Sequence, residues 1–175
     1  LTTTKPARLP KTHRSIRKTI ASIVVAIVVA CVVFPPLYWP VRGAVSSEFL
    51  FRFKPDSRMP ALEIHHGIDI AASSGTAIFP SALGIVQTSA YSSELGNYVI
   101  IRHPFGFSTL YAHLQKPGIH KGAIALPALS HIGSVGASGR ATGPHLHVGV
   151  FWLGVALPPR LMFAFHSARR LLLGF

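Results

Sequence analysis

The chain has 175 residues, of which 17 are Lys or Arg and 5 are Asp or Glu, so its formal net charge is +12. Hydrophobic residues make up 49% of it, which excludes the composition typical of intrinsic disorder. The length suits one domain of ordinary size with short appendages. A single Cys excludes a disulfide framework and any zinc or redox motif built on paired cysteines.

The positive charge is concentrated at the N-terminus. Residues 1–19 carry +6 without any acid, residues 41–157 carry +3, and residues 158–175 carry another +3. A nucleic-acid-binding domain would hold the excess charge on its own surface. We therefore expect no nucleic-acid partner and interpret residues 1–19 as a basic cytoplasmic segment.

An apolar segment follows directly. Residues 20–34 contain no charge, Gly or Pro, and the stretch counted through Trp39 has 20 residues, which is about the length that crosses ~30 Å of hydrocarbon. Tyr38 and Trp39 occupy the place of an interfacial aromatic pair. The basic flank predicts a cytoplasmic N-terminus and export of everything after it. We therefore expect residues 20–39 to form a membrane anchor, with the rest on the extracytoplasmic side of a bacterial envelope.

Three other interpretations of this segment stay open. A charged stretch before an apolar one also fits a cleaved signal peptide. The residues Val28-Val29-Ala30 before Cys31 resemble a lipoprotein-type signal, in which Cys31 would be acylated. A buried core helix would leave the basic flank unexplained.

Residues 41–157 predict an all-β domain. Short β-prone runs alternate with Gly, Pro and Ser, which favours a compact, mainly antiparallel sandwich or barrel over alternating strands and helices. The expected strands are 77–79, 84–88, 98–102, 108–113 and 146–152. The tail, residues 158–175, fits either an amphipathic surface helix with Leu161, Phe165 and Leu172 on one side or an extension without function.

Histidine spacing supplies the functional signal. His65 precedes Asp69 by four residues, and His145 and His147 stand at i and i+2, which places both rings on one face of a strand. His113 is a further candidate, from a third segment of the chain. Imidazole nitrogen and carboxylate oxygen are ordinary zinc ligands, and three protein ligands with one open position are typical of a catalytic zinc. No GxSxG string occurs, which argues against a serine nucleophile, and Cys31 lies in the apolar segment, which argues against a cysteine nucleophile.

Several strings together resemble one family. They are His65-His66-Gly67-Ile68-Asp69-Ile70-Ala71, the stretch from Gly96 to His103, Ser108–Leu114, and the ending Thr142-Gly143-Pro144-His145-Leu146-His147. These are similar, in order and spacing, to the motifs of the lysostaphin-type (LytM-domain) zinc endopeptidases of bacterial cell walls. The resemblance covers residues 44–151.

The resemblance implies one zinc per chain held by His65, Asp69 and His147, with His113 and His145 as the catalytic pair beside it. It also implies hydrolysis of peptide bonds in peptidoglycan. Either histidine of the pair can act as general base near neutral pH. We prefer His145, because it neighbours His147, and assign His113 to the oxyanion or leaving group, although the two roles could be exchanged.

The chain departs from the family pattern at two places. Gly149 stands where the family usually has Glu, so we expect weaker support of that strand but intact chemistry. The region between Ser47 and His65 is short, so we expect one wall of the groove to be small. The alternative function is a non-catalytic LytM-like module that binds cell wall or activates an amidase.

Overall fold

In this computed structural model, residues 16, 18–22, 37–54 and 61–173 are described. The β domain lies within one compact unit, Pro35–Phe175. Its elements are β1 (Ala44–Ser47), β2 (Leu50–Lys54), β3 (Ala61–His65), β4 (Ile68–Ala71), β5 (Ala77–Ile78), β6 (Gly84–Ser92), β7 (Gly96–Arg102), the 3-10 turn η1 (Pro104–Gly106), β8 (Phe107–Pro117), β9 (Ile124–Ala125), β10 (Gly133–Val135), β11 (His145–Trp152), β12 (Val155–Leu157) and α2 (Pro159–Leu173).

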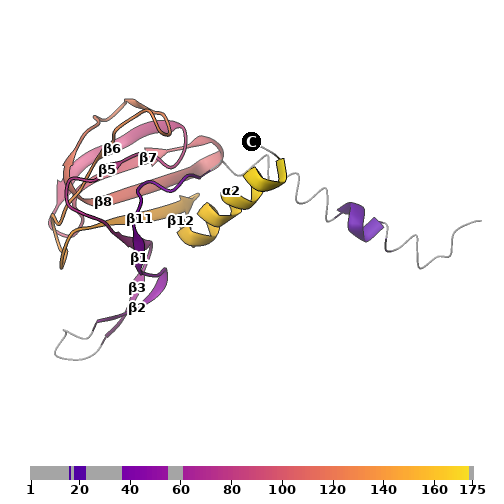
Figure 1. Cartoon of the computed structure of the whole chain (residues 1–175), viewed down its shortest axis with the longest axis horizontal. Helices are drawn as coiled ribbons and strands as arrows, with labels where there is room; N and C mark the ends of the chain where they lie inside the picture. Colours follow the sequence, from indigo (N-terminus) through magenta and orange to yellow (C-terminus); the bar gives the residue numbers. More distant parts are fainter. Residues whose placement is uncertain (1–15, 17, 23–36, 55–60, 174–175) are drawn as a thin grey trace, which may run out of the picture. The chain divides into compact units, whose positions relative to one another are not determined.

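One antiparallel sheet forms most of the domain (Figure 1). Its strand order is β1-β4-β11-β8-β7-β6-β9, with β12 beside β11 and the short strands β5 and β10 paired at one side. The prediction of a mainly antiparallel β domain is confirmed. Each of the five predicted strands is present, and most extend further than expected, because pairing with neighbours adds residues that lack strong β propensity.

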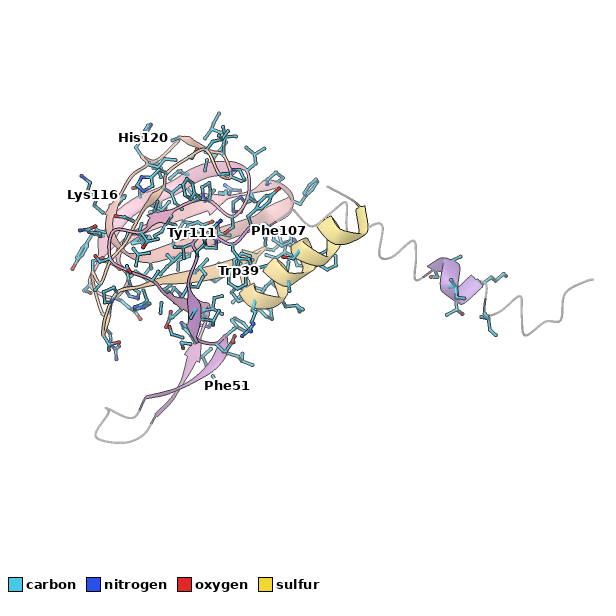
Figure 2. All side chains as sticks on the ribbon, in the orientation of Figure 1. Trp39, Phe51, Phe107, Tyr111, Lys116 and His120 are labelled. Carbon is cyan, nitrogen blue, oxygen red and sulfur yellow. The ribbon has the colours of Figure 1, made fainter. Side chains whose placement is uncertain are left out.

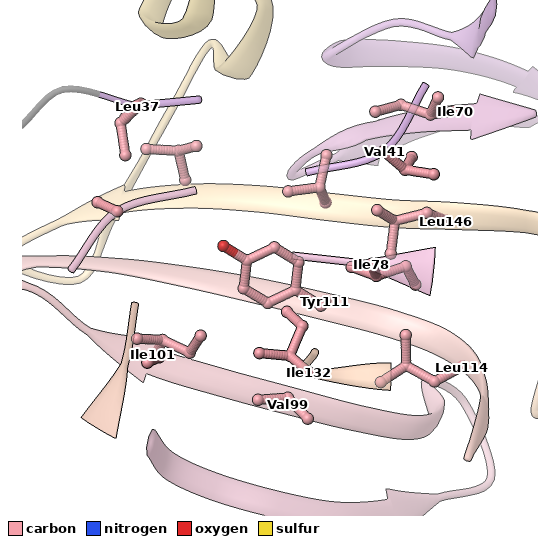
Figure 3. Packing of buried hydrophobic residues seen from close by; sticks show 14 of the residues in the cluster. Leu37, Val41, Ile70, Ile78, Val99, Ile101, Tyr111, Leu114, Ile132 and Leu146 are labelled. Atoms are coloured by element: carbon pink, nitrogen blue, oxygen red, sulfur yellow. The ribbon is translucent and has the colours of Figure 1, made fainter. Parts of the chain in front are cut away.

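The core consists of aliphatic side chains around Tyr111 on one face of this sheet (Figure 3). Ile68 and Ile70 of β4 and Leu146, Val148 and Val150 of β11 are fully buried there. The alternation of a strand therefore sends Asp69, His145 and His147 to the opposite face. The apolar residues thus position the polar ones.

The segment before His65 forms its own two-stranded sheet. β2 and β3 pair antiparallel, with Leu50 opposite His65 and Phe51 opposite Ile64. The two strands project from the main sheet as a ribbon (Figure 1). Although the segment is short, its two described strands pair along their whole length up to His65.

The helix α2 is anchored on the domain by its first turns. Phe163 is fully buried in the core and packs against Trp39, with ring centroids 4.7 Å apart. Arg160 pairs with Glu48 across the exposed side of the helix. The tail is therefore helical, as one of the two interpretations expected, and its first turns pack on the β domain.

The apolar segment of residues 20–39 lies mostly outside the described residues. Residues 18–22 are helical, and no helix of the described part of the chain is long and apolar enough to cross a membrane. Leu37 is buried in the core, and the Tyr38 amide donates to the Ser81 carbonyl, so the β domain begins directly after Pro35-Pro36. The membrane anchor stays a prediction, but residues 37–39 of the expected segment pack on the β domain, so Tyr38 and Trp39 are placed by contacts within that domain.

A buried polar network lies under one end of the sheet. The Nδ1 atom of His103 is 2.8 Å from the Leu83 carbonyl, and its Nε2 atom is 2.8 Å from the Thr109 hydroxyl, which is also hydrogen-bonded to Tyr111. Since a carbonyl can only accept, Nδ1 carries the hydrogen, and a neutral ring accepts at Nε2. Burial lowers the pKa of His103, and the bond to the Leu83 carbonyl opposes this only in part.

This network predicts a stability that depends on pH. The unfolded chain protonates His103 below about pH 6.5, whereas the folded chain resists protonation, so the free energy of unfolding decreases as the pH falls below that value. The variant His103→Asn keeps a donor for the Leu83 carbonyl but leaves the Thr109 hydroxyl without its nitrogen partner. We expect it to cost about 1–3 kcal/mol at pH 7.5 and to flatten the pH dependence between pH 7.5 and 5. Urea unfolding at several pH values measures both, and an unchanged pH slope would contradict this account.

Candidate functional site

Three side chains from three strands converge on one point. His65 ends β3, Asp69 lies in β4 and His147 lies directly opposite Asp69 in β11. The His65 Nε2 atom is 3.0 Å from His147 Nδ1 and 3.2 Å from Asp69 Oδ1, and His147 Nδ1 is 2.9 Å from Asp69 Oδ1. All three residues are largely shielded from solvent. The sequence places two of these residues 78 positions apart, and the β4–β11 register brings them together.

The spacing of these atoms fits a metal ion. A tetrahedral zinc with bonds of about 2.0–2.1 Å separates its ligands by about 3.3 Å, so the three donor atoms need to move apart by only a few tenths of an ångström. Among the described residues, this trio is the group of His, Cys, Asp or Glu that can hold an ion. Two imidazoles and a carboxylate form a donor set that suits a divalent transition metal.

The protein orients His65 through its backbone. The Nδ1 atom of His65 is 2.8 Å from the Glu48 carbonyl in the connection between β1 and β2. Nδ1 must donate to that oxygen, so the lone pair of Nε2 points at Asp69 and His147. Such a bond fixes both the tautomer and the direction of a ligating imidazole.

The electrostatics of the trio keep Asp69 ionised. Burial by itself would raise the pKa of the Asp69 carboxyl, but as long as the His147 and His65 rings carry their second proton, hydrogen bonds from them and their positive charges outweigh burial and hold the pKa well below its ordinary value. Burial lowers the pKa of His147, against the opposing effect of Asp69. A charged carboxylate beside neutral imidazoles is the protonation state in which a metal binds.

Two further imidazoles flank the trio with a shared orientation. The Nδ1 atom of His145 is 2.8 Å from the Gly143 carbonyl, and the Nδ1 atom of His113 is 2.9 Å from the Ser138 carbonyl. Their ring centroids are 4.8 Å apart, and His145 Nε2 is 3.9 Å from Asp69 Oδ1. Both Nδ1 atoms donate to carbonyls, so each neutral ring offers Nε2 as a proton acceptor.

A local break in β8 aims His113 at the site. In a regular strand His113 would share the core face with Tyr111, two residues earlier. Its φ of 60° shifts the alternation, so that Leu114 enters the core and the His113 ring lies 6.1 Å from the His147 ring. Burial lowers the pKa of His113, and the charges of His145 and His147 lower it further, against the Ser138 carbonyl and Asp69.

The structure brings together all five histidine and aspartate residues that sequence reasoning selected. His66, His120 and His131 are exposed, and His103 is buried in the separate network at the other end of β8. Sequence reasoning missed the carbonyls of Glu48, Ser138 and Gly143. No residue type signals such a role, because every residue has a carbonyl, and only the folded backbone shows which of them face the imidazoles.

The sequence matches peptidase family M23 over residues 63–159, more than half of the chain. The chain belongs to this family. The resemblance to lysostaphin-type peptidases is therefore confirmed. The match begins inside β3 and ends where α2 begins, so β1, β2 and most of α2 lie outside it.

Two curated relatives and one solved structure show how far the similarity extends. The chain is 41% identical over 103 residues to the DD-carboxypeptidase/endopeptidase Mpg of Neisseria meningitidis, covering 59% of this chain and 23% of Mpg. It is 38% identical over 99 residues to the peptidoglycan DD-endopeptidase ShyC of Vibrio cholerae, covering 57% of this chain and 23% of ShyC. A zinc containing peptidase from Vibrio cholerae superposes with a TM-score of 0.62 at 28% identity, covering 71% and 40% of the two chains. The chain thus spans about a quarter of the length of these curated relatives.

Gly149, which stands where the resemblance implies a Glu, lies against the side chain of Phe151. A Cβ atom on Gly149 would lie 2.8 Å from the Phe151 ring, which fills the space of a side chain there. The strand β11 nevertheless pairs with β8 without a break, with Gly149 opposite Leu110, whereas its pairing with β4 ends at Val148. A ring two residues further along therefore occupies the space beside Gly149.

Gly67 provides a test of the metal centre that changes none of the three ligand residues. A Cβ atom on Gly67 would lie 2.7 Å from His147 Cε1 and 2.5 Å from the Val148 carbonyl, so Gly67→Ala should displace the His147 ring. We expect a decrease in affinity for a divalent metal of about 10- to 100-fold, the range seen when a ligand loses its orientation. Equilibrium dialysis measures this decrease.

The matched control is Gly143→Ala, because no heavy atom outside the neighbouring residues lies within 4 Å of the added methyl group. The Gly143 carbonyl stays available to the Nδ1 atom of His145. This variant should bind the metal as the parent chain does. Equal metal affinity of Gly67→Ala and the parent would show that the His147 ring is not held as the structure describes.

Proposed function

We propose that the chain is a membrane-tethered zinc metalloendopeptidase that hydrolyses peptide bonds in the stem or cross-link peptides of peptidoglycan. The observation that carries this proposal is the convergence of His65, Asp69 and His147 with two more imidazoles, each of which is held through Nδ1 by a backbone carbonyl. Membership of peptidase family M23 and the names of the relatives support the substrate class.

Zinc is the metal that we propose for this site. His65 Nε2, Asp69 Oδ1 and His147 Nδ1 would hold it, with one ion per chain and one position left open. Bound there, zinc would act as a Lewis acid and lower the pKa of a bound water from ~15.7 toward ~7. The zinc containing peptidase among the structural neighbours supports this choice.

We assign the proton transfers to His145 and His113. His145 Nε2 is 3.9 Å from Asp69 Oδ1, so it lies close enough to the ligands to take a proton from the attacking water. The His113 ring lies next to His145 and near the ligand His147, at centroid distances of 4.8 and 6.1 Å. Because its Nδ1 hydrogen is committed to Ser138, His113 can donate from Nε2 only when the ring carries a second proton, which it would take from solvent. It would then stabilise the oxyanion or protonate the leaving amine.

We place the peptidase domain outside the cytoplasm. The six basic residues before the apolar segment support a cytoplasmic N-terminus. The β domain begins at Leu37, so an anchor that ends at Pro35-Pro36 would hold the domain close to the outer face of the cytoplasmic membrane. Peptidoglycan is on that side.

Histidine variants separate ligands from proton-transfer groups. We expect His65→Ala and His147→Ala to lose both bound zinc and cleavage of cross-linked muropeptides. His113→Ala and His145→Ala should retain about one zinc per chain while the cleavage rate falls by roughly 10²- to 10⁴-fold, the contribution typical of a general acid or base. Metal analysis of the purified chain and mass analysis of the products provide the two readouts.

The control is His66→Ala, because His66 adjoins a ligand in sequence but is exposed. It should keep both zinc and activity. Stoichiometric zinc without cleavage in the parent chain would instead identify a non-catalytic module, and cleavage that survives chelation would exclude the proposed chemistry.

A further inference from the structure

An exposed apolar surface lies at the end of the sheet opposite to the metal site. It is formed by the β7–β8 turn and the β11–β12 turn, and we name it the apolar tip. Its members are Phe105, Trp152, Leu153 and Val155, which are 63%, 41%, 72% and 65% exposed. Phe107, directly behind the tip, is labelled in Figure 2 at the end of the sheet that faces α2. Turn positions are usually polar, so Phe105 and Leu153 in the turns, with Trp152 and Val155 on the strand ends beside them, require an explanation.

The two turns are locked to each other. The Trp152 indole donates to the Phe105 carbonyl at 3.0 Å, and the Leu153 amide donates to the Gly106 carbonyl at 3.0 Å. The Trp152 ring stacks with Phe107 at a centroid distance of 6.2 Å. The apolar tip is thus a pre-arranged surface held by hydrogen bonds between two turns.

Two residues of the apolar tip have a left-handed backbone conformation, which large apolar residues rarely adopt. Phe105 has a φ of 60° and Leu153 a φ of 48°, both in the left-handed region where Gly and Asn are better accommodated. Each turn therefore presents a large apolar side chain from a conformation that costs stability. Phe105 and Leu153 lower the stability of the fold and are not buried in it. A binding partner that contacts them explains their presence better than the fold does.

A groove lined by apolar and cationic residues lies beside the apolar tip. Pro104, next to Phe105, borders a groove of about 740 Å³ that is also lined by Leu83, Ile85, Ile124, Arg102 and Lys121. The three aliphatic side chains are exposed, as are Arg102 and Lys121. Residues 95–175 contain no Asp or Glu, so no acidic residue of this part of the chain neutralises Arg102 and Lys121. Anionic groups are therefore the complement of this surface.

The chain enters the domain at the same end. The Tyr38 amide donates to the Ser81 carbonyl, and the Ser81 amide donates to the Tyr111 hydroxyl. That hydroxyl belongs to the network that reaches His103, the residue before the β7–β8 turn. Leu37 follows directly after Pro35-Pro36 and lies inside the segment 20–39 predicted as an anchor, so residues 20–36 are what remains for the anchor itself.

We infer that the apolar tip rests on the surface of an anionic phospholipid bilayer. Trp152 and Phe105 would lie at the level of the head groups, Leu153 and Val155 would reach the acyl boundary, and Arg102 and Lys121 would face the lipid phosphates. His147 precedes Trp152 by five residues in β11, which is about 17 Å at ~3.3 Å per residue. The contact would therefore turn the metal site away from the bilayer and toward the wall.

This inference goes beyond the proposed function, on which it rests only for the anchor that brings the domain to a membrane. The test uses the full chain reconstituted in vesicles of phosphatidylcholine with a minority of phosphatidylglycerol. The chain has two tryptophans, so Trp39→Phe leaves Trp152 as the only emitter. In vesicles with brominated acyl chains, we expect Trp152 emission to be quenched relative to ordinary vesicles.

The double variant Phe105→Asn, Leu153→Asn, in the Trp39→Phe background, should lose most of this quenching. Asn accepts the left-handed conformation, so the thermal unfolding midpoint should stay the same or rise, which separates a lost contact from a lost fold. The matched control is Tyr91→Ser, which removes an exposed aromatic residue near the far end of β6 and should leave the quenching unchanged.

Three results would overturn the inference. A chain that floats with the vesicles but shows equal Trp152 emission in brominated and ordinary lipid keeps its anchor and lacks the tip contact. A chain that does not float with the vesicles lacks both the anchor and the tip contact. Trp152 emission that is shifted to the blue, is not quenched and varies with protein concentration would assign the tip to contacts between copies. Because none of these readouts involves metal or cleavage, failure of the peptidase proposal would leave them unaffected.

Discussion

The register between β4 and β11 is the constraint on which the site depends. Asp69 lies opposite His147 because Ile70 and Ile68 on one strand, and Leu146 and Val148 on the other, all face the core. A slip of one residue would turn the apolar side chains of a strand to solvent and its polar ones to the core, so the burial of these four residues specifies the register. The metal site is in this sense a consequence of the core, because the ligands occupy the positions that the apolar residues leave.

Once the register is set, the backbone completes the site. The carbonyls of Glu48, Ser138 and Gly143 each accept from the Nδ1 atom of one imidazole and direct its Nε2 atom inward. Three loops from different parts of the chain therefore decide the tautomers of His65, His113 and His145. Because the site depends on loop positions, side-chain ligands transferred to another sheet without those loops would have no fixed orientation.

The sequence predicted the side chains of the site but not their supports. The spacing of His65 and Asp69 and of His145 and His147 is visible in the chain, because a two-residue period maps directly onto one face of a strand. The position of His113 could not be derived in that way, since its φ of 60° breaks the period. The β2–β3 ribbon and the burial of Phe163 were also not predicted, because both depend on partners distant in sequence. The fate of residues 23–36 and the roles of the two proton-transfer histidines stay predictions.

The domain has different chemistry at its two ends, with ionisable groups around β4 and the start of β11 and apolar turns after the end of β11. The central claim is that the three converging ligands hold one zinc ion on which peptide cleavage depends. The most direct measurement is a titration of the metal-free chain with zinc, followed by the initial rate of muropeptide cleavage. The account predicts a rate that rises in proportion to zinc and reaches its plateau at one ion per chain. Cleavage by the metal-free chain, or full occupancy at one ion with no cleavage at all, would contradict it.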